Sequence, residues 1–237
     1  MGKRAEGTGV SIIVCTNRPQ FFNNLIRNFL SQRYRNKELI IILNKDSMDL
    51  AHYRSRASVY ADIRVYQVPE RISLGQALNC GITKAKFPLI AKFDDDDYYS
   101  PFYLTEQVKA LARTNSDIVG KHSCLVHLSA SGKLLIRSPR ERDKRTVYVQ
   151  GGTILFKRRV LEKVRFPDKS VGEDTTFLYQ CRKRGFRAYA TSPFNYVYMR
   201  RGDKKTHTWR ASDQFYLEGS VVLGVTRDYR KIANRKA

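Results

Sequence analysis

Cysteine is scarce in this chain and does not occur in pairs. The 237 residues contain four cysteines, Cys15, Cys80, Cys124 and Cys181, which lie far apart and mostly among apolar neighbours. A zinc site usually needs Cys-x-x-Cys spacing, and a small disulfide-bonded protein needs a higher density of cysteine. We therefore expect small core residues in a reducing compartment, rather than a zinc site or a disulfide framework.

The apolar stretch near the start of the sequence is short, so we expect it to be neither a signal peptide nor a membrane-spanning helix. Its first residues include Lys3, Arg4 and Glu6, and the apolar stretch after them ends before Thr16. That stretch is far shorter than the roughly 20 apolar residues that cross a membrane. These features favour a cytoplasmic protein, either free or resting on the inner face of the membrane through its positive charge.

Acidic residues are half as frequent as basic ones. The chain has 22 Asp and Glu against 44 Lys and Arg, which gives a formal net charge of +22. Nucleic acid, anionic lipid, nucleotide phosphates and acidic polymers are therefore all eligible partners. The basic residues form several runs, at 137–145, 157–163, 182–187 and 200–210. For any single run, the solvated face of an ordinary basic protein explains the charge equally well.

No internal repeat or low-complexity segment divides the chain. Its 42% hydrophobic content suffices for one sizeable core. We expect one domain over residues 1–226 and a basic tail over residues 227–237. The tail is poor in apolar residues, which predicts either a frayed helix or disorder.

Strand and helix patterns alternate in the first part of the chain. Strands are predicted at 10–15, 38–43, 63–68 and 87–93, and helices after Pro19, at 47–60 and at 74–83. This alternation predicts an α/β fold with a mostly parallel central sheet covered by helices. After a helix that begins near Pro101, residues 117–128 and 133–137 predict a hairpin. Further strands are expected up to residue 156, with short helices at 158–164 and 173–184.

In open parallel sheets, ligands gather at the carboxyl ends of the strands. The sequence places three polar loops there: Thr16-Asn17-Arg18, Asn44-Lys45-Asp46 and the four aspartates at 94–97. We expect these loops to share one rim of the sheet.

The four consecutive aspartates are the most conspicuous feature of this basic chain. Extended geometry would send Asp94 and Asp96 to one side and Asp95 and Asp97 to the other. A hard cation such as Mn²⁺ or Mg²⁺ relieves their repulsion and can bridge a carboxylate to a diphosphate. The run therefore indicates phosphate-linked group transfer. The alternative is a solvated acidic loop before a helix, stabilised by the helix dipole.

A second acidic pair, Glu173-Asp174, begins the helix predicted at 173–184. Acidic residues at this position are favoured by the helix dipole alone, so a structural role is as well supported as a catalytic one. A carboxylate near a metal-bound diphosphate could also deprotonate an attacking hydroxyl.

Taken in order, these motifs resemble glycosyltransferase family 2, inverting enzymes with the Rossmann-like GT-A fold, over roughly residues 9–200. The similar segments are the opening strand and loop at 11–18, the second strand and loop at 38–49, Gly-Gln-Ala-Leu-Asn-Cys-Gly-Ile at 75–82, Phe-Asp-Asp-Asp at 93–96, the acceptor-side strand at 150–157, and Gly-Glu-Asp-Thr at 172–175. Within the family, the form Phe-Asp-Asp-Asp-Asp-Tyr-Tyr at 93–99 resembles transferases of spore maturation in bacilli.

The resemblance implies a nucleotide-sugar-binding half over residues 9–115 and a smaller, mixed acceptor-binding half over 116–226. It implies Asp174 as the catalytic base. The implied donor-binding residues are Thr16, Asn17, Arg18, Asn44, Asp46, Gln76, Asn79, Asp94 and Asp95, and the implied metal ligands are Asp94, Asp96 and His207. The chain departs from the family at Asn44-Lys45, where two aspartates are common, and at Leu78, where arginine is common.

The expected reaction is the transfer of a sugar from a nucleotide diphosphate, a UDP-sugar, to a hydroxyl, with inversion. The acceptor would be a glycan, an anionic glycopolymer or a lipid-linked intermediate in cell-surface or spore polysaccharide synthesis, with no specific nucleic acid as partner. One alternative is a non-enzymatic protein that binds polyanions through its charge. A nucleotidyltransferase is the other, although the loop at 16–19 lacks the glycines that hold a triphosphate.

Overall fold

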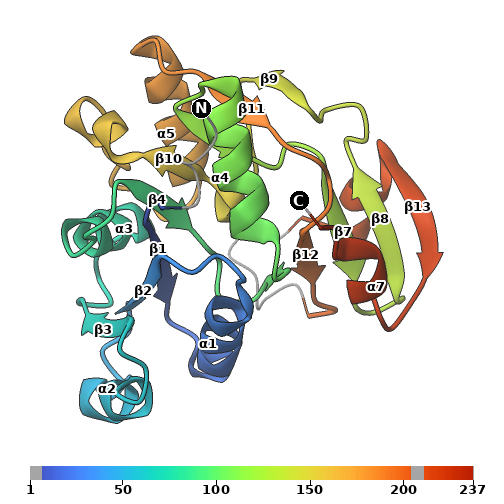
Figure 1. Cartoon of the computed structure of the whole chain (residues 1–237). Helices are drawn as coiled ribbons and strands as arrows, with labels where there is room; N and C mark the ends of the chain where they lie inside the picture. Colours follow the sequence, from blue (N-terminus) through green and yellow to red (C-terminus); the bar gives the residue numbers. More distant parts are fainter. Residues whose placement is uncertain (1–6, 204–210, 237) are drawn as a thin grey trace.

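Two β-sheets flanked by helices form the fold (Figure 1). The structure is a computed structural model that describes residues 7–203 and 211–236. The larger sheet has eight strands in the order β3-β2-β1-β4-β10-β6-β11-β9, and the smaller has five in the order β13-β8-β7-β12-β5. The α/β architecture predicted from the sequence is confirmed.

The first half builds the parallel part of the larger sheet. Its elements are β1 (Val10–Thr16), the 3₁₀ turn η1 (Pro19–Phe21), α1 (Phe22–Ser31), β2 (Lys37–Leu43), α2 (Leu50–Ala57), β3 (Ile63–Gln67), α3 (Leu74–Thr83) and β4 (Leu89–Lys92). β1 lies between β2 and β4, parallel to both. Helix α2 begins later than predicted because Asp49 caps it, accepting a hydrogen bond from the amide of Ala51.

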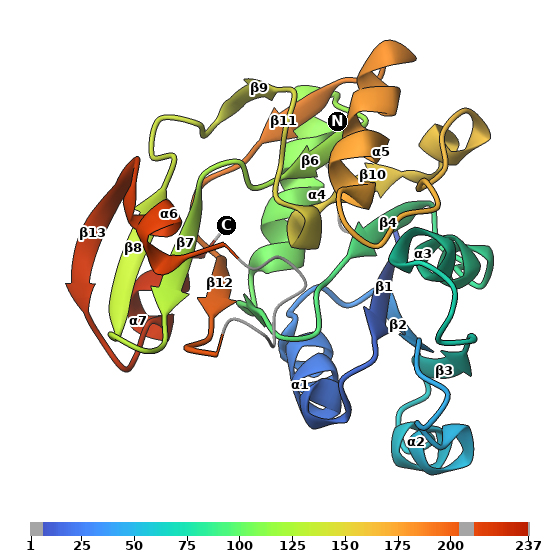
Figure 2. The same ribbon diagram turned by 180° about the vertical axis from the view of Figure 1, so that it is seen from behind.

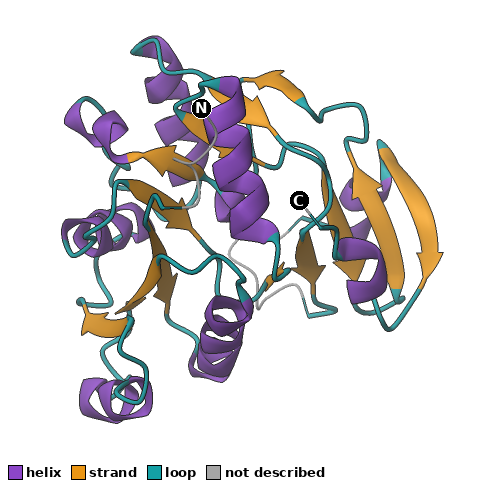
Figure 3. Ribbon diagram, viewed as in Figure 1, coloured by secondary structure: helices purple, strands orange, loops and turns teal. Residues whose placement is uncertain are grey.

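Both faces of this sheet are covered, which explains its continuous apolar strands. Along β1, Ile12 and Val14 pack into one core with α1 and α4, whereas Ile13 packs into the other core with α3 and α5. Figure 2 shows α3 and α5 on the face opposite to α4, and Figure 3 shows helices on both sides of the strands. A half-buried strand would alternate apolar and polar residues, so this pattern follows from burial on both faces.

The second half adds shorter elements to both sheets. They are β5 (Tyr98–Tyr99), α4 (Tyr103–Thr114), β6 (Ile118–Gly120), β7 (Cys124–Leu128), β8 (Lys133–Arg137), β9 (Lys144–Thr146), η2 (Gly151–Thr153), β10 (Leu155–Lys157), η3 (Arg158–Glu162), α5 (Glu173–Lys183), β11 (Ala188–Ala190), β12 (Tyr196–Arg200), α6 (Asp213–Leu217), β13 (Ser220–Val225) and α7 (Arg230–Ala233). β7 and β8 form the predicted hairpin. The strand predicted over 117–128 is wrong as one piece, because β6 joins the larger sheet and β7 the smaller.

Strand β10 joins the two halves of the chain. It lies antiparallel between β4 and β6, with Leu155 opposite both Ala91 and Val119. Because β4 belongs to the first half and β6 to the second, one continuous sheet crosses the boundary between them.

The basic C-terminal segment is ordered against the smaller sheet. Of the two forms expected for it, the helix is observed as α7, and Ala233 is fully buried. The amide of Asn195 donates to the carbonyl of Ala233 at 2.8 Å. Across residues 7–203 and 211–236, no helix is both long and apolar enough to cross a membrane.

Candidate active site

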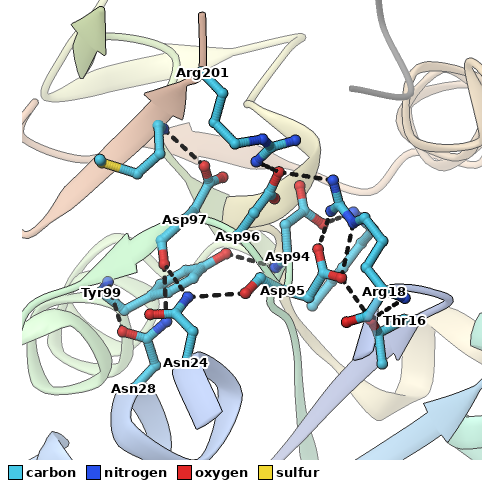
Figure 4. Close-up of polar contacts among 12 residues, drawn as sticks. Thr16, Arg18, Asn24, Asn28, Asp94, Asp95, Asp96, Asp97, Tyr99 and Arg201 are labelled. Carbon is cyan, nitrogen blue, oxygen red and sulfur yellow. Dashed lines mark hydrogen bonds and ion pairs between the residues drawn. The ribbon is translucent and has the colours of Figure 1, made fainter. Parts of the chain in front are cut away.

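The acidic run lies at the carboxyl end of β4, as predicted. Residues 95–97 form bends rather than the expected extended strand, but the expected pairing is seen in burial, because Asp95 and Asp97 are buried and Asp94 and Asp96 are more exposed. The guanidinium of Arg18 reaches two adjacent aspartates, Asp95 and Asp96 (Figure 4). Behind the run, the ring of Phe93 stacks on Tyr99 with centroids 3.7 Å apart, which fixes the bend against the core.

Two of the four carboxylates are buried and bonded within the protein. Asp95 accepts hydrogen bonds from the hydroxyl of Thr16 at 2.6 Å and from Arg18. Asp97 accepts from the hydroxyl of Tyr196 and from the amide of Met199. Burial raises the pKa of Asp95 to about 6 and raises the pKa of Asp97 well above its ordinary value. These contacts hold the loop in place.

The other two aspartates are more accessible. The side chain of Asp94 is 36% exposed, and its carboxylate accepts from the ammonium of Lys92 at 2.6 Å. Asp96 is 10% exposed and pairs with Arg18 at 3.0 Å and with Arg201. Despite burial, the two guanidinium groups hold the pKa of Asp96 below its ordinary value. The two predicted metal ligands of this loop are thus the least enclosed of the four.

The chemistry of these two carboxylates suits a hard divalent cation, because both supply oxygen ligands. Within the described ranges, no group of three or more His, Cys, Asp or Glu side chains is arranged to hold a metal ion. Two arginines occupy Asp96, so a cation there would replace contacts that guanidinium groups now make. His207, the third predicted ligand, lies outside the described residues.

A buried lysine connects the acidic run to helix α5. Lys92 is 5% exposed, and its ammonium lies 4.0 Å from the carboxylate of Glu173 as well as against Asp94. Burial lowers the pKa of Lys92, but the carboxylates of Asp94, Glu173 and Asp174 outweigh it and leave that pKa above its usual value. Burial also raises the pKa of Glu173 to about 7, although Lys92 opposes the rise.

Two glycines bring the predicted base and the acidic run to one turn. A Cβ atom on Gly151 would collide with the carboxylate of Asp174, and a Cβ on Gly152 would lie 2.6 Å from Oδ2 of Asp94. The hydroxyl of Tyr99 donates to the carbonyl of Gly152 at 2.6 Å, which fixes the turn under the acidic run. Asp94 and Asp174, 80 positions apart, therefore both contact the same turn.

Other predicted donor-binding residues make contacts within the protein. Asn44 donates from its side-chain amide to the carbonyl of Pro69, and Asp46 accepts from the amide of Glu70. Asn17 is exposed directly after β1. Asn44 and Asp46 follow β2 and Asn17 follows β1, so these residues lie on the expected rim.

The two polar residues predicted on α3 bond to the segment before α5. Gln76 donates to Asp168 at 2.8 Å, and Asn79 donates to the carbonyl of Phe166 at 2.8 Å. The amide of Phe166 donates back to Asn79 at 3.2 Å. This exchange positions the segment that leads into Glu173 and Asp174.

Several residues at the site were not predicted from the sequence. Asn24 and Asn28 of α1 donate to the backbone carbonyl of Asp97, and Asn24 also donates to that of Asp95 (Figure 4). Arg201 reaches Asp96 from the end of β12, and its guanidinium lies over the ring of Phe21, 4.9 Å from the centroid. Asn24 and Asn28 are four residues apart on one helix face, and this spacing could have predicted a shared role. No local pattern in the sequence pointed to Arg201.

Comparison with known proteins decides the family. Residues 11–124 match the sequence model of the family described as Glycosyl transferase family 2. They are a glycosyltransferase family 2 domain. This matched region contains the acidic run and most of its contacts, and the resemblance inferred from the motifs is confirmed.

Curated relatives agree with this family. The chain is 24% identical over 191 residues to poly-beta-1,6-N-acetyl-D-glucosamine synthase of Staphylococcus aureus, covering 74% of this chain and 46% of that protein. It is 26% identical over 167 residues to the O-antigen biosynthesis glycosyltransferase WbnJ of Escherichia coli, covering 66% of this chain and 64% of that one. The chain thus spans about half to two thirds of the length of these glycosyltransferases.

Solved structures confirm the GT-A fold. S. aureus TarS 1-349 in complex with UDP-GlcNAc superposes with a TM-score of 0.67 at 15% identity, covering 89% of this chain and 64% of that one. The mannosyltransferase PcManGT of Pyrobaculum calidifontis, in complex with GDP-Man and Mn²⁺, superposes with a TM-score of 0.66 at 21% identity. This match covers 97% of this chain and 66% of that one.

Proposed function

We propose that this family 2 domain is a metal-dependent, inverting glycosyltransferase that uses a UDP-sugar. The observation that supports it most is the meeting of Asp94 and Asp174 at the turn formed by Gly151 and Gly152. A group that binds the donor phosphates and a group that accepts a proton must lie on either side of one reacting carbon. Among the similar structures, TarS binds UDP-GlcNAc and PcManGT binds GDP-Man with Mn²⁺.

Each acidic group has a distinct role in this proposal. Asp94 and Asp96 would hold Mn²⁺ or Mg²⁺, which offsets the charge that develops on the leaving diphosphate. Asp174 accepts the proton of the acceptor hydroxyl as that oxygen attacks the anomeric carbon. Attack opposite to the leaving group inverts the configuration. Thr16 and Arg18 keep Asp95 in place beneath the donor.

Lys92 has a positioning role. Its ammonium attracts the donor-side carboxylate of Asp94 and the carboxylate of Glu173, the residue before the proposed base. Because Lys92 is buried, this attraction is screened less than an exposed ion pair would be. It therefore fixes the start of α5, and Asp174 with it, relative to the acidic run.

Two substitutions test the roles separately. We expect Asp174→Asn to keep Mn²⁺-dependent UDP binding and to lose transfer by a factor of about 10³, since proton acceptance contributes about 10²–10⁴. Asp96→Ala should lose Mn²⁺-dependent UDP binding. Asp62→Asn, an exposed aspartate before β3, serves as the control and should behave as the wild type. Near-normal turnover by Asp174→Asn would remove it from the base role.

The donor and the class of protein can be tested together. Metal-dependent hydrolysis of a panel of UDP-sugars should single out one donor. Thermal stabilisation by UDP with Mn²⁺ should exceed stabilisation by an oligonucleotide across a salt series. The reverse result, with salt-sensitive oligonucleotide binding alone, would favour a polyanion-binding protein, which the net charge of +22 would allow.

The acceptor in this proposal is a glycan, a glycopolymer or a lipid-linked intermediate. Two relatives are named for polysaccharide or O-antigen synthesis, and the positive charge would attract an anionic acceptor. The four cysteines are free thiols, which suits a reducing compartment. We therefore place the activity in the cytoplasm, at the inner face of the membrane. Spore polysaccharide synthesis is one pathway that such an enzyme could serve.

A further inference from the structure

An exposed apolar strand forms one edge of the smaller sheet. Among residues 7–203 and 211–236, β13 pairs with β8 on one side only, and Figures 1 and 2 show it at the outer margin of the molecule. Four large apolar side chains of this strand are open to solvent: Val221 at 49%, Val222 at 51%, Leu223 at 39% and Val225 at 73%. Phe215 of the adjacent α6 is 37% exposed. Such a concentration of exposed apolar groups marks an interaction surface.

Charge does not protect this edge. Soluble proteins usually guard edge strands with charged residues, proline or β-bulges, and β13 has a register shift between Val222 and Gly224 but neither a charged residue nor proline. Its exposed side chains alternate between the two faces of the sheet, since Val221 lies opposite Ile136 and Val222 lies opposite Leu135. A strand added at the edge would pair with the backbone but would leave side chains on both faces exposed. A partner that contacts both faces of the sheet at once would therefore cover these side chains better than a single added strand.

Basic residues outnumber acidic ones around the strand, although the exposed Glu218 precedes it. Lys133 lies opposite Val225 at one end of β13, and Arg137 lies opposite Ser220 at the other. The chain from residue 220 to residue 236 contains one acidic residue, Asp228, and the basic residues Arg227, Arg230, Lys231, Arg235 and Lys236. All five of these are exposed.

The positive charge around β13 favours one of two candidate partners for this edge, a second copy of the chain or a lipid membrane. A second copy of the chain would bring an equally basic border against it, and the two would repel. A negatively charged bilayer offers both complements at once, since its headgroups attract Lys and Arg and its interface accepts apolar side chains. The polar headgroup region also supplies hydrogen-bonding partners for the outer edge of the strand.

We propose that the β13 edge, defined as Phe215, Val221, Val222, Leu223 and Val225 with its basic border, docks the protein on an anionic membrane. β13 and β5 are the two edges of the same five-stranded sheet, and β5 directly follows the acidic run. Four strand spacings of about 4.8 Å separate them by about 19 Å. Docking would therefore hold the acidic run within about 20 Å of the lipid surface, in reach of a lipid-linked acceptor, if the proposed transferase activity holds.

Vesicle binding tests this proposal independently of catalysis. The full chain is mixed with vesicles of phosphatidylcholine alone or with phosphatidylglycerol, and the bound fraction is measured by flotation at several salt concentrations. The variant Val222→Ser/Leu223→Ser removes apolar contact at the edge. The matched control is Val59→Ser/Val147→Ser, two valines exposed elsewhere, at 77% and 60%. Arg227→Gln/Lys231→Gln removes charge from the border.

We expect binding to the anionic vesicles, weakened by salt. The edge variant should lower the partition coefficient about tenfold or more, because two apolar side chains no longer insert. The charge variant should lower it on anionic vesicles alone, and the valine control should match the wild type. UDP-sugar hydrolysis in solution should be equal in all variants, so a failure of docking and a failure of the transferase proposal are separable. Absence of vesicle binding would overturn the proposal, as would a dimer that only the edge variant dissociates in sedimentation.

Discussion

Replacing Lys92 with methionine removes a buried positive charge that joins the acidic run to α5. The change keeps the length and the apolar stem of the side chain, and leaves Asp94 and Glu173 without their shared cation. Breaking a buried ion pair typically costs about 3–5 kcal/mol. Asp94 is 36% exposed and can be hydrated in compensation, so we expect about 3 kcal/mol at pH 8, near the lower bound.

The loss should depend on pH through Glu173. Its pKa in the folded protein is about 7, above the ordinary 4.5, so the folded state binds the proton more tightly than the unfolded state. Stability from this group is therefore present at low pH and is lost as pH rises from about 4.5 to about 7. Without Lys92 the folded pKa rises further, and the loss continues above pH 7. At pH 5.5 Glu173 is mostly protonated in both proteins, and the difference should shrink to about 1–2 kcal/mol.

Urea denaturation at pH 5.5 and pH 8 measures the stability lost in Lys92→Met and the dependence of that loss on pH. Lys121→Met is the matched control, because Lys121 is also fully buried and pairs with Glu106 at 2.7 Å, away from Glu173. Its cost at pH 8 should be similar in size. The proposed contact of Lys92 with both Asp94 and Glu173 is refuted if Lys92→Met lowers the free energy of unfolding equally at both pH values. It is also refuted if the cost at pH 8 is below about 1 kcal/mol, which is far less than the loss of a buried ion pair entails.

Three further substitutions have distinct expected outcomes. Gly151→Ala should displace the carboxylate of Asp174 and lower kcat about tenfold or more, with UDP–Mn²⁺ affinity unchanged in calorimetry; a loss of affinity alone would contradict this. Tyr196→Phe removes a hydrogen bond to a buried carboxylate and should cost about 2 kcal/mol in urea unfolding, whereas an unchanged midpoint would show that the bond contributes little. Arg201→Met frees Asp96 from one guanidinium and should tighten Mn²⁺ binding without nucleotide, measured by electron paramagnetic resonance; weaker binding would oppose it.

The first half of the chain was predictable because its strands are buried on both faces. Their continuous apolar runs stand out from the helices between them, and each predicted strand from β1 to β4 is observed. The division of β6 from β7 left no such signal. Both segments are apolar, and the chain changes sheets between them at Lys121, which finds its partner Glu106 only in the folded protein.

The candidate site was predictable in its acidic residues and not in its basic ones. Asp94 and Asp174 were named from motifs, and the fold brings both to one turn. Lys92 was read as an ordinary strand residue, because its proximity to Glu173 depends on how α5 packs under β4. Arg201 likewise reaches Asp96 only through the packing of β12 beside the acidic run. Ion pairs between distant segments depend on tertiary structure and leave no local pattern.

The antiparallel strand β10 limits how this domain could be re-engineered. Chimaeras that exchange acceptor specificity would naturally be cut near residue 116, between the two halves. Such a cut places β4 and β10 in different parts of the chimaera. In this protein, residues 89–91 of β4 pair with residues 155–157, the whole of β10. A graft must therefore reproduce the backbone register of Leu155 against Ala91, as well as the exposed loops of the grafted half. Substitutions confined to exposed loops would leave the pairing of β4 with β10 intact, so they are less disruptive than a chimaera.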